Sequence, residues 1–142
     1  MPPVKYFPRL NLYKAANVTF DPSTVVATSY DWWCFVTVIR GRVVFNEYPY
    51  SATTRKHQAK VKALMAELGI TPDIVVSTRL SLGNVNALED AMQGALKEAE
   101  FFEGKAATAR SLRGHYLSIA GEQLQRAEAI KQLIKMTERV AS

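Results

Sequence analysis

The chain has 142 residues, of which 48% are apolar and 22% are charged, and its formal net charge is +5. This length fits one domain with a single core, and the composition is that of an ordinary globular protein. No stretch approaches the roughly 20 apolar residues of a membrane span, and residues 1–6 contain no signal-peptide core, so we expect a cytoplasmic protein without membrane contact. Cys34 is the only cysteine and stands in an apolar run, which excludes an internal disulfide and indicates a buried small hydrophobe.

Residues 1–78 have the composition of β-structure, whereas residues 79–142 have the pattern of helices. Prolines divide the first 24 residues into short segments, with weak strand patterns at residues 10–13 and 18–20. A much stronger strand pattern covers residues 25–39, where β-branched and aromatic side chains dominate. The first half therefore predicts a sheet with one long central strand.

Alternation along that strand predicts two faces, formed by Trp32, Cys34, Val36 and Val38 and by Trp33, Phe35, Thr37 and Ile39. We expect both tryptophans to be buried, because large aromatic side chains usually anchor cores; the alternative is that one of them belongs to a protein-interaction surface. Gly41 can take a positive φ, so residues 40–42 predict a tight turn, and residues 43–48 return as the hairpin partner.

A helix is predicted from about Thr53 to Leu68. Ser51 or Thr53 would cap its N-terminus, and Gly69 would take the left-handed conformation after its end. Its apolar stripe consists of Val61, Leu64, Met65 and Leu68. Residues 73–78 predict another short strand.

Two long helices are predicted in residues 79–142. The first runs from its cap, Asn84, to Gly104, with a stripe of Val85, Leu88, Met92, Leu96, Ala99 and Phe102. The second covers residues 106–139, with a stripe of Leu112, Tyr116, Ala120, Leu124, Ala127, Ile130 and Ile134, and whether Gly114 and Gly121 break it stays open. The predicted fold is α+β: a small antiparallel sheet with one crossing helix, in the order hairpin, helix and strand, then an antiparallel helical hairpin covering one sheet face, all in a single domain.

Charge is distributed in three blocks. Residues 40–62 carry six cations and one acid, residues 84–104 one cation and five acids, and residues 105–142 seven cations and three acids. This layout indicates separate faces with separate partners. Intramolecular pairing is expected across the helical turn, between Glu98, Glu100 and Glu103 on one side and Lys105, Arg110 and Arg113 on the other.

The first basic block contains the candidate site, a surface for nucleic acid or another anion. Its residues are Arg40, Arg42, Tyr50, Ser51, Arg55, Lys56, Lys60 and Lys62. Cations neutralise phosphates, hydroxyl groups and a helix N-terminus attract anions, and tyrosine stacks on bases. The alternative is an ordinary solvated helix face beside an ordinary cap, and whether Arg40 and Arg42 reach the helix depends on how their turn folds.

No constellation in the sequence favours catalysis. The two histidines, His57 and His115, are far apart and have no cysteine at zinc-ligand spacing, so we predict neither a metal nor another cofactor. The serines lack a nucleophile-elbow context, and there is no glycine-rich phosphate loop. We therefore expect a protein without enzymatic activity.

Residues 46–57 read Asn-Glu-Tyr-Pro-Tyr-Ser-Ala-Thr-Thr-Arg-Lys-His and follow a tryptophan-rich hairpin. They resemble a Tyr-Ser-x-Thr-Thr-x-x-His pattern of small uncharacterised phage and mobile-element proteins, over about residues 32–57. Those proteins have no firmly assigned activity, so the resemblance implies no site residues. It does imply a viral accessory role, as a host-takeover factor, an anti-defence inhibitor or a minor structural protein.

Two functions therefore stay open. The first is a phage-type accessory protein that binds nucleic acid, or a host protein that processes it, through the basic helix face. The second is a protein–protein inhibitor or scaffold acting through its C-terminal helices. That second hypothesis includes a homodimer formed through residues beside the main stripe: Leu117, Ile119, Leu133 and Met136.

Overall fold

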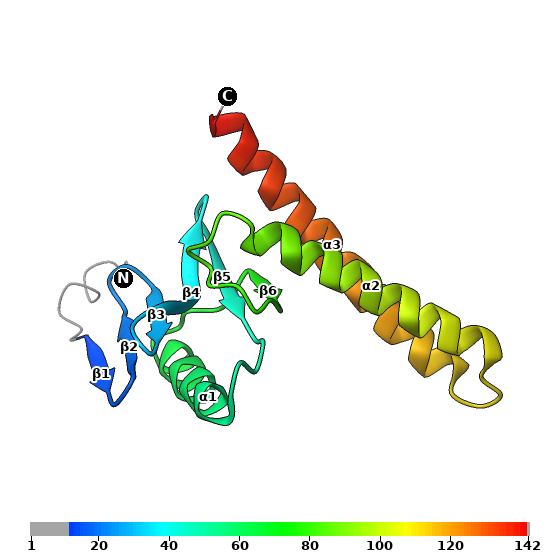
Figure 1. Cartoon of the computed structure of the whole chain (residues 1–142), viewed down its shortest axis with the longest axis horizontal. Coiled ribbons are helices and arrows are strands. Elements are labelled where there is room, and N and C mark those ends of the chain that lie inside the picture. Colours follow the sequence, from blue (N-terminus) through cyan, green and yellow to red (C-terminus); the bar gives the residue numbers. More distant parts are fainter. Residues whose placement is uncertain (1–11, 142) are drawn as a thin grey trace.

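The computed structural model describes residues 12–141, with side chains for residues 12–137. Within this part the elements are β1 (Tyr13–Ala15), β2 (Val18–Asp21), β3 (Val26–Ser29), β4 (Trp33–Ile39), β5 (Arg42–Asn46), α1 (Ala52–Glu67), β6 (Ile74–Val76), α2 (Ala87–Thr108) and α3 (Arg113–Ala141). Strands β1 to β5 form an antiparallel meander, and β6 pairs in parallel with β5 (Figure 1). The predicted α+β fold with a C-terminal helical hairpin is confirmed; residues 10 and 11 of the first expected strand lie outside the described residues.

The expected long strand over residues 25–39 is wrong, because a turn divides it into β3 and β4. Tyr30 and Asp31 form this turn with φ angles of 56° and 64°. Neither residue is a glycine, and residues other than glycine rarely adopt a positive φ. Local sequence propensity therefore did not predict the turn. The second turn was predicted: Arg40 and Gly41 both have positive φ between β4 and β5, as a tight hairpin requires.

A β-bulge decides which side chains of β4 enter the core. The register between β3 and β4 shifts between Ala27 and Thr28, which leaves Phe35 as an extra residue on β4. Trp33, Phe35 and Val36 consequently all belong to one buried cluster. The strict alternation predicted for this strand is therefore wrong.

Helix α1 covers one face of the sheet. It begins after its N-cap Ser51, ends at its C-cap Leu68 and is followed by Gly69 with φ 73°, as predicted. Val61 and Met65 are buried against the bulged strand, and the other two members of the predicted stripe pack at the edge of the same cluster.

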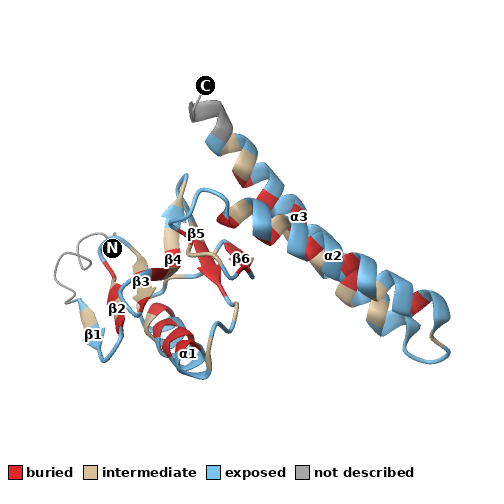
Figure 2. Ribbon diagram, viewed as in Figure 1, coloured by how far each residue is buried: buried red, intermediate tan, exposed pale blue. Residues whose placement is uncertain are grey.

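The base of the helical hairpin covers the opposite face. A second buried cluster joins Val44, Ile74, Val76, Leu82, Ala87, Ala91, Ile130 and Leu133. Beyond this base, α2 and α3 continue together away from the sheet, with buried residues confined to the seam between them (Figure 2). The molecule thus has a covered sheet and a protruding helical arm.

The seam of the arm differs from the predicted stripes. The buried residues of α2 are Ala87, Ala91, Ala95, Ala99 and Ala106. Val85, by contrast, is 96% exposed and Leu96 is 40% exposed. The predicted α2 stripe was therefore wrong at these two positions, whereas its Ala99 is buried and its Leu88 and Met92 pack against the second cluster. The first four buried alanines, spaced four residues apart, let the two helices approach closely. The predicted α3 stripe is confirmed at Ala120, Ala127 and Ile130, which are buried. Helix α2 continues through Gly104, its predicted end, to Thr108. Helix α3 is not broken at Gly114 or Gly121.

Two neighbouring substitutions test this seam. Ala99→Leu forces extra volume into the α2–α3 contact and should lower the free energy of unfolding by about 1–3 kcal/mol. Leu96→Ala, three residues away and exposed, should lower it by less than about 1 kcal/mol. Urea denaturation followed by circular dichroism measures both, and the reverse order of effects would contradict the alanine seam.

Candidate nucleic-acid interface

A chain of hydrogen bonds fixes the start of α1 on the sheet. The Thr54 amide donates to Ser51 Oγ over 3.0 Å, and the Ser51 hydroxyl donates to Thr54 Oγ1, also over 3.0 Å. Thr54 Oγ1 lies 3.3 Å from Ser29 Oγ on β3, which lies 2.8 Å from His57 Nδ1. Because Thr54 Oγ1 accepts from Ser51, we infer that the Thr54 proton points to Ser29 and that the Ser29 proton points to Nδ1. This order leaves the His57 ring proton on Nε2.

This series of hydrogen bonds holds the structure together, and its Ser29–His57 contact is not a catalytic dyad. Ser29 is 0% exposed, so its hydroxyl has no access to a substrate despite its contact with a histidine. Burial lowers the pKa of His57, and the hydrogen bond to the Ala16 backbone only partly opposes this effect, so the ring is neutral. The Ser51 hydroxyl proton is donated to Thr54 Oγ1, and its oxygen accepts the Thr54 amide. Ser51 therefore has no proton left for its predicted role as a donor to an anion.

The four cations of α1 are all exposed, but they form two columns rather than one cluster. Arg55 and Lys62 are seven residues apart, or about two turns, and Lys56 and Lys60 are about one turn apart. Lys62 Nζ lies 5.9 Å from the Phe45 ring on β5, whereas Lys60 Nζ lies 5.7 Å from the ring of Tyr13 on β1. The columns therefore flank the helix on its two sides.

Between the two columns, the outer surface of α1 carries only short side chains. Ala59, Ala63 and Ala66 are exposed there, and their methyl groups leave room for a ligand to approach the helix closely. No acid side chain lies on α1 before Glu67. The outer face of the helix is therefore a positive surface with short side chains along its middle.

Arg40 and Arg42 do not extend this surface around the N-terminus of α1. Asp73, which follows α1, exchanges hydrogen bonds with Val43, so the end of the helix lies near the start of β5. Gln58, in the middle of α1, donates to the carbonyl oxygen of Asn46, so the N-terminal half of the helix lies near the end of β5. The turn with the two arginines is at the other end of β5 and therefore lies away from Ser51.

An exposed aromatic pair adjoins the N-terminus of α1. Trp33 is buried, but Trp32 is 56% exposed, so the expectation that both are buried is wrong for Trp32. The rings of Trp32 and Tyr50 pack edge to face, with centroids 5.6 Å apart. Tyr50 also contacts Trp33, with centroids 5.4 Å apart. Tyr50 was a predicted site residue; Trp32 was missed because its exposure depends on the turn at residues 30–31.

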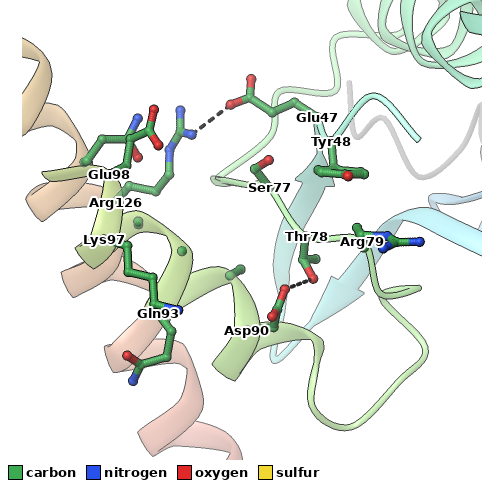
Figure 3. A pocket seen from close by; sticks show the side chains of 14 residues that line it. Glu47, Tyr48, Ser77, Thr78, Arg79, Asp90, Gln93, Lys97, Glu98 and Arg126 are labelled. Carbon is green, nitrogen blue, oxygen red and sulfur yellow. Dashed lines mark hydrogen bonds and ion pairs between the residues drawn. The ribbon is translucent and has the colours of Figure 1, made fainter. Parts of the chain in front are cut away.

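A cleft opens between the sheet and the helical arm (Figure 3). Its volume is about 430 Å³, and its charged lining residues are Glu47, Arg79, Asp90, Lys97, Glu98 and Arg126. Arg126 donates to Glu47 across the cleft over 2.8 Å, and Thr78 Oγ1 donates to Asp90 over 2.5 Å. These contacts join the residue after β5 to α3, and the β6–α2 loop to α2. Three acids and three cations leave the cleft without net charge, so it does not favour an anion.

The expected ion pairs across the helical turn are not formed. The turn lies at residues 109–112, and the one ion pair among the described side chains joins Glu47 and Arg126. Lys105 instead lies 5.2 Å from the Phe101 ring and 5.7 Å from the Tyr116 ring. The glutamates of α2 therefore face solvent.

The predicted homodimer surface is also changed. Leu117 is exposed, and Ile119 and Met136 are half-buried. Leu133, however, is 1% exposed and packs against the sheet, so its place on a free surface is wrong. The reason is that the base of α3 turns this side toward β6.

His57 gives the site a pH-dependent stability. Because its pKa is lower in the folded chain than the unfolded value of about 6.5, the stabilisation is complete above that pH and is lost as the pH falls below it. The denaturation midpoint should therefore fall as the pH decreases from about 7 to 5. His57→Gln should be less stable overall, with a flatter dependence over this range, and His115→Gln, at an exposed position, should keep the fall. Equal slopes in the two variants would contradict this role.

The described residues contain no group of three His, Cys, Asp or Glu side chains placed to hold a metal ion. In the same part of the chain, none of the helices has the length and apolar content that crossing a bilayer requires. No protein-family model, curated protein or solved structure matches the chain.

Proposed function

We propose that the chain is a non-enzymatic nucleic-acid-binding protein that uses the outer face of α1. The observation that carries this proposal is the set of four exposed cations on both sides of a low helix surface, Arg55, Lys56, Lys60 and Lys62. None of them forms an ion pair within the described side chains. Their charge is therefore free to neutralise phosphates and release counterions, without reading the base sequence.

The biological setting follows the resemblance of residues 32–57. We place the protein in the cytoplasm of a host cell, as an accessory factor of a phage or mobile element. A host protein that processes nucleic acid is the alternative partner for the same surface, since such a protein can present acidic side chains in place of phosphates.

Salt dependence tests the proposal. If each of the four cations neutralises one phosphate, the plot of log affinity against log salt concentration should have a slope of about −3 for a single strand. Arg55→Glu combined with Lys56→Glu should weaken binding more than tenfold, because two attractions become two repulsions. Fluorescence anisotropy of a labelled oligonucleotide measures both quantities.

The matched control reverses two exposed cations elsewhere, Lys131→Glu with Lys135→Glu on α3. It makes the same change in net charge and should weaken binding much less. An equal loss in both double variants would show that net charge alone, and not the α1 surface, attracts the nucleic acid.

A second candidate function, self-association through the helical arm, is favoured by its exposed leucines. Leu117 is 47% exposed and Leu124 is 44% exposed, and their spacing of about two turns places them on one face of α3. Neither lines the cleft, and both stay exposed among the described residues.

Charge on this face separates the two functions. Leu117→Glu with Leu124→Glu should convert a dimer to a monomer in light scattering while leaving oligonucleotide affinity unchanged. Ser118→Glu, at an exposed position of the same helix, should leave the dimer intact. A wild-type chain that is monomeric at all concentrations would eliminate self-association.

A further inference from the structure

We propose that the nucleic acid bound by this protein is single-stranded, with an unpaired base stacked on Trp32. This inference rests on the proposed function and specifies its substrate class. It starts from the position of the aromatic pair Trp32 and Tyr50, which adjoins the basic face of α1.

The ring of Trp32 is available for stacking. The two rings are nearly perpendicular, with an interplanar angle of 82°, so Tyr50 covers at most one face of the indole. Trp32 is more than half exposed, and Tyr50 is 41% exposed. A planar base can therefore lie against an indole face that no described residue covers completely.

The backbone holds Trp32 in this exposed position. Its amide donates to the carbonyl oxygen of Ser29, and its own carbonyl oxygen accepts from Ser81 Oγ. The turn before it contains Tyr30 and Asp31, both with positive φ, as Arg40 and Gly41 have in the next hairpin turn. The exposed indole is thus presented by a fixed turn rather than by a loose side chain.

Two segments that adjoin this pair carry exposed cations. Arg55 and Lys56 follow Tyr50 in the first turns of α1, and Arg79, whose carbonyl oxygen accepts the Trp33 indole proton over 2.8 Å, is also exposed. The one acid in the turn is Asp31. An aromatic platform bordered by cations matches a strand that offers a base face and phosphates together.

A single strand fits this arrangement better than a duplex. In a duplex each base is already stacked on its neighbours and paired, so an aromatic side chain reaches it only by distorting the helix. In a single strand the base faces are free. Phosphate contacts alone would bind both forms, so preference for the single strand is the property that Trp32 adds.

The test compares labelled oligo-dT with a duplex of the same length at one salt concentration, by fluorescence anisotropy. Trp32→Ala should weaken single-strand binding about 5- to 100-fold and duplex binding far less. Trp32→Phe should restore most of the loss, because its ring also stacks. Phe101→Ala removes an equally exposed aromatic residue on the arm and should have no effect; both side chains are 56% exposed.

Intrinsic fluorescence gives an independent readout. Trp33 is buried, so quenching on addition of oligo-dT should come from Trp32 and should vanish in Trp32→Phe. If wild type binds no nucleic acid, the proposed function itself fails. If it binds, but Trp32→Ala has no effect or weakens both forms equally, only the stacking inference is overturned. Loss of capture of a host protein, with oligonucleotide binding unchanged, would likewise overturn it in favour of a protein interface.

Discussion

The hydrogen bonds that seat α1 on the sheet are the constraint on which the surface features depend. Three side chains in this series of hydrogen bonds, those of Ser29, Thr54 and His57, are buried, so each of their polar atoms needs a partner within the protein. The arrangement gives each of them a partner, in a series of hydrogen bonds that runs from the Ser51 cap to the His57 ring. Gln58 adds bonds to the carbonyl oxygens of Asn46 and Tyr48. The helix is therefore fixed in rotation as well as in position.

This constraint explains the motif at the start of the helix without invoking catalysis. Tyr50 packs on Trp33, Ser51 caps the helix, Thr54 connects the cap to β3, and His57 ends the chain of bonds. Each of these residue types is used for packing or hydrogen bonding. The cations between them point outward because the opposite side of the helix packs on the sheet. The hydrogen bonds of the buried face thus determine which side chains form the exposed face.

The bulge at Phe35 has a similar effect on the aromatic residues. By placing Trp33, Phe35 and Val36 in the same cluster, it fills the space beneath α1 with large side chains. Trp32 is then left on the outside, at the edge of the helix N-terminus. The core packing and the aromatic pair that we assign to base stacking thus arise from the same short segment.

Much of the fold could be predicted from residue patterns, since the cap at Ser51, the glycines after α1 and in the β4–β5 turn, and the two C-terminal helices all have local signals. The turn at residues 30–31, the bulge and the alanine seam could not, because each depends on tertiary packing that overrides local preference. For the site, the α1 cations could be found as a charge cluster. Their division into two columns, the distance of Arg40 and Arg42, and the exposure of Trp32 required the register of the sheet.

The most direct test of the central claim is the protonation state of the His57 ring, measured from its ¹⁵N chemical shifts by NMR at neutral pH. The hydrogen-bond chain requires a neutral ring that carries its proton on Nε2, with Nδ1 accepting from Ser29. That tautomer, lost on Ser29→Ala, is the result the account predicts. A proton on Nδ1, or a charged ring, would show that α1 is not held in the way described.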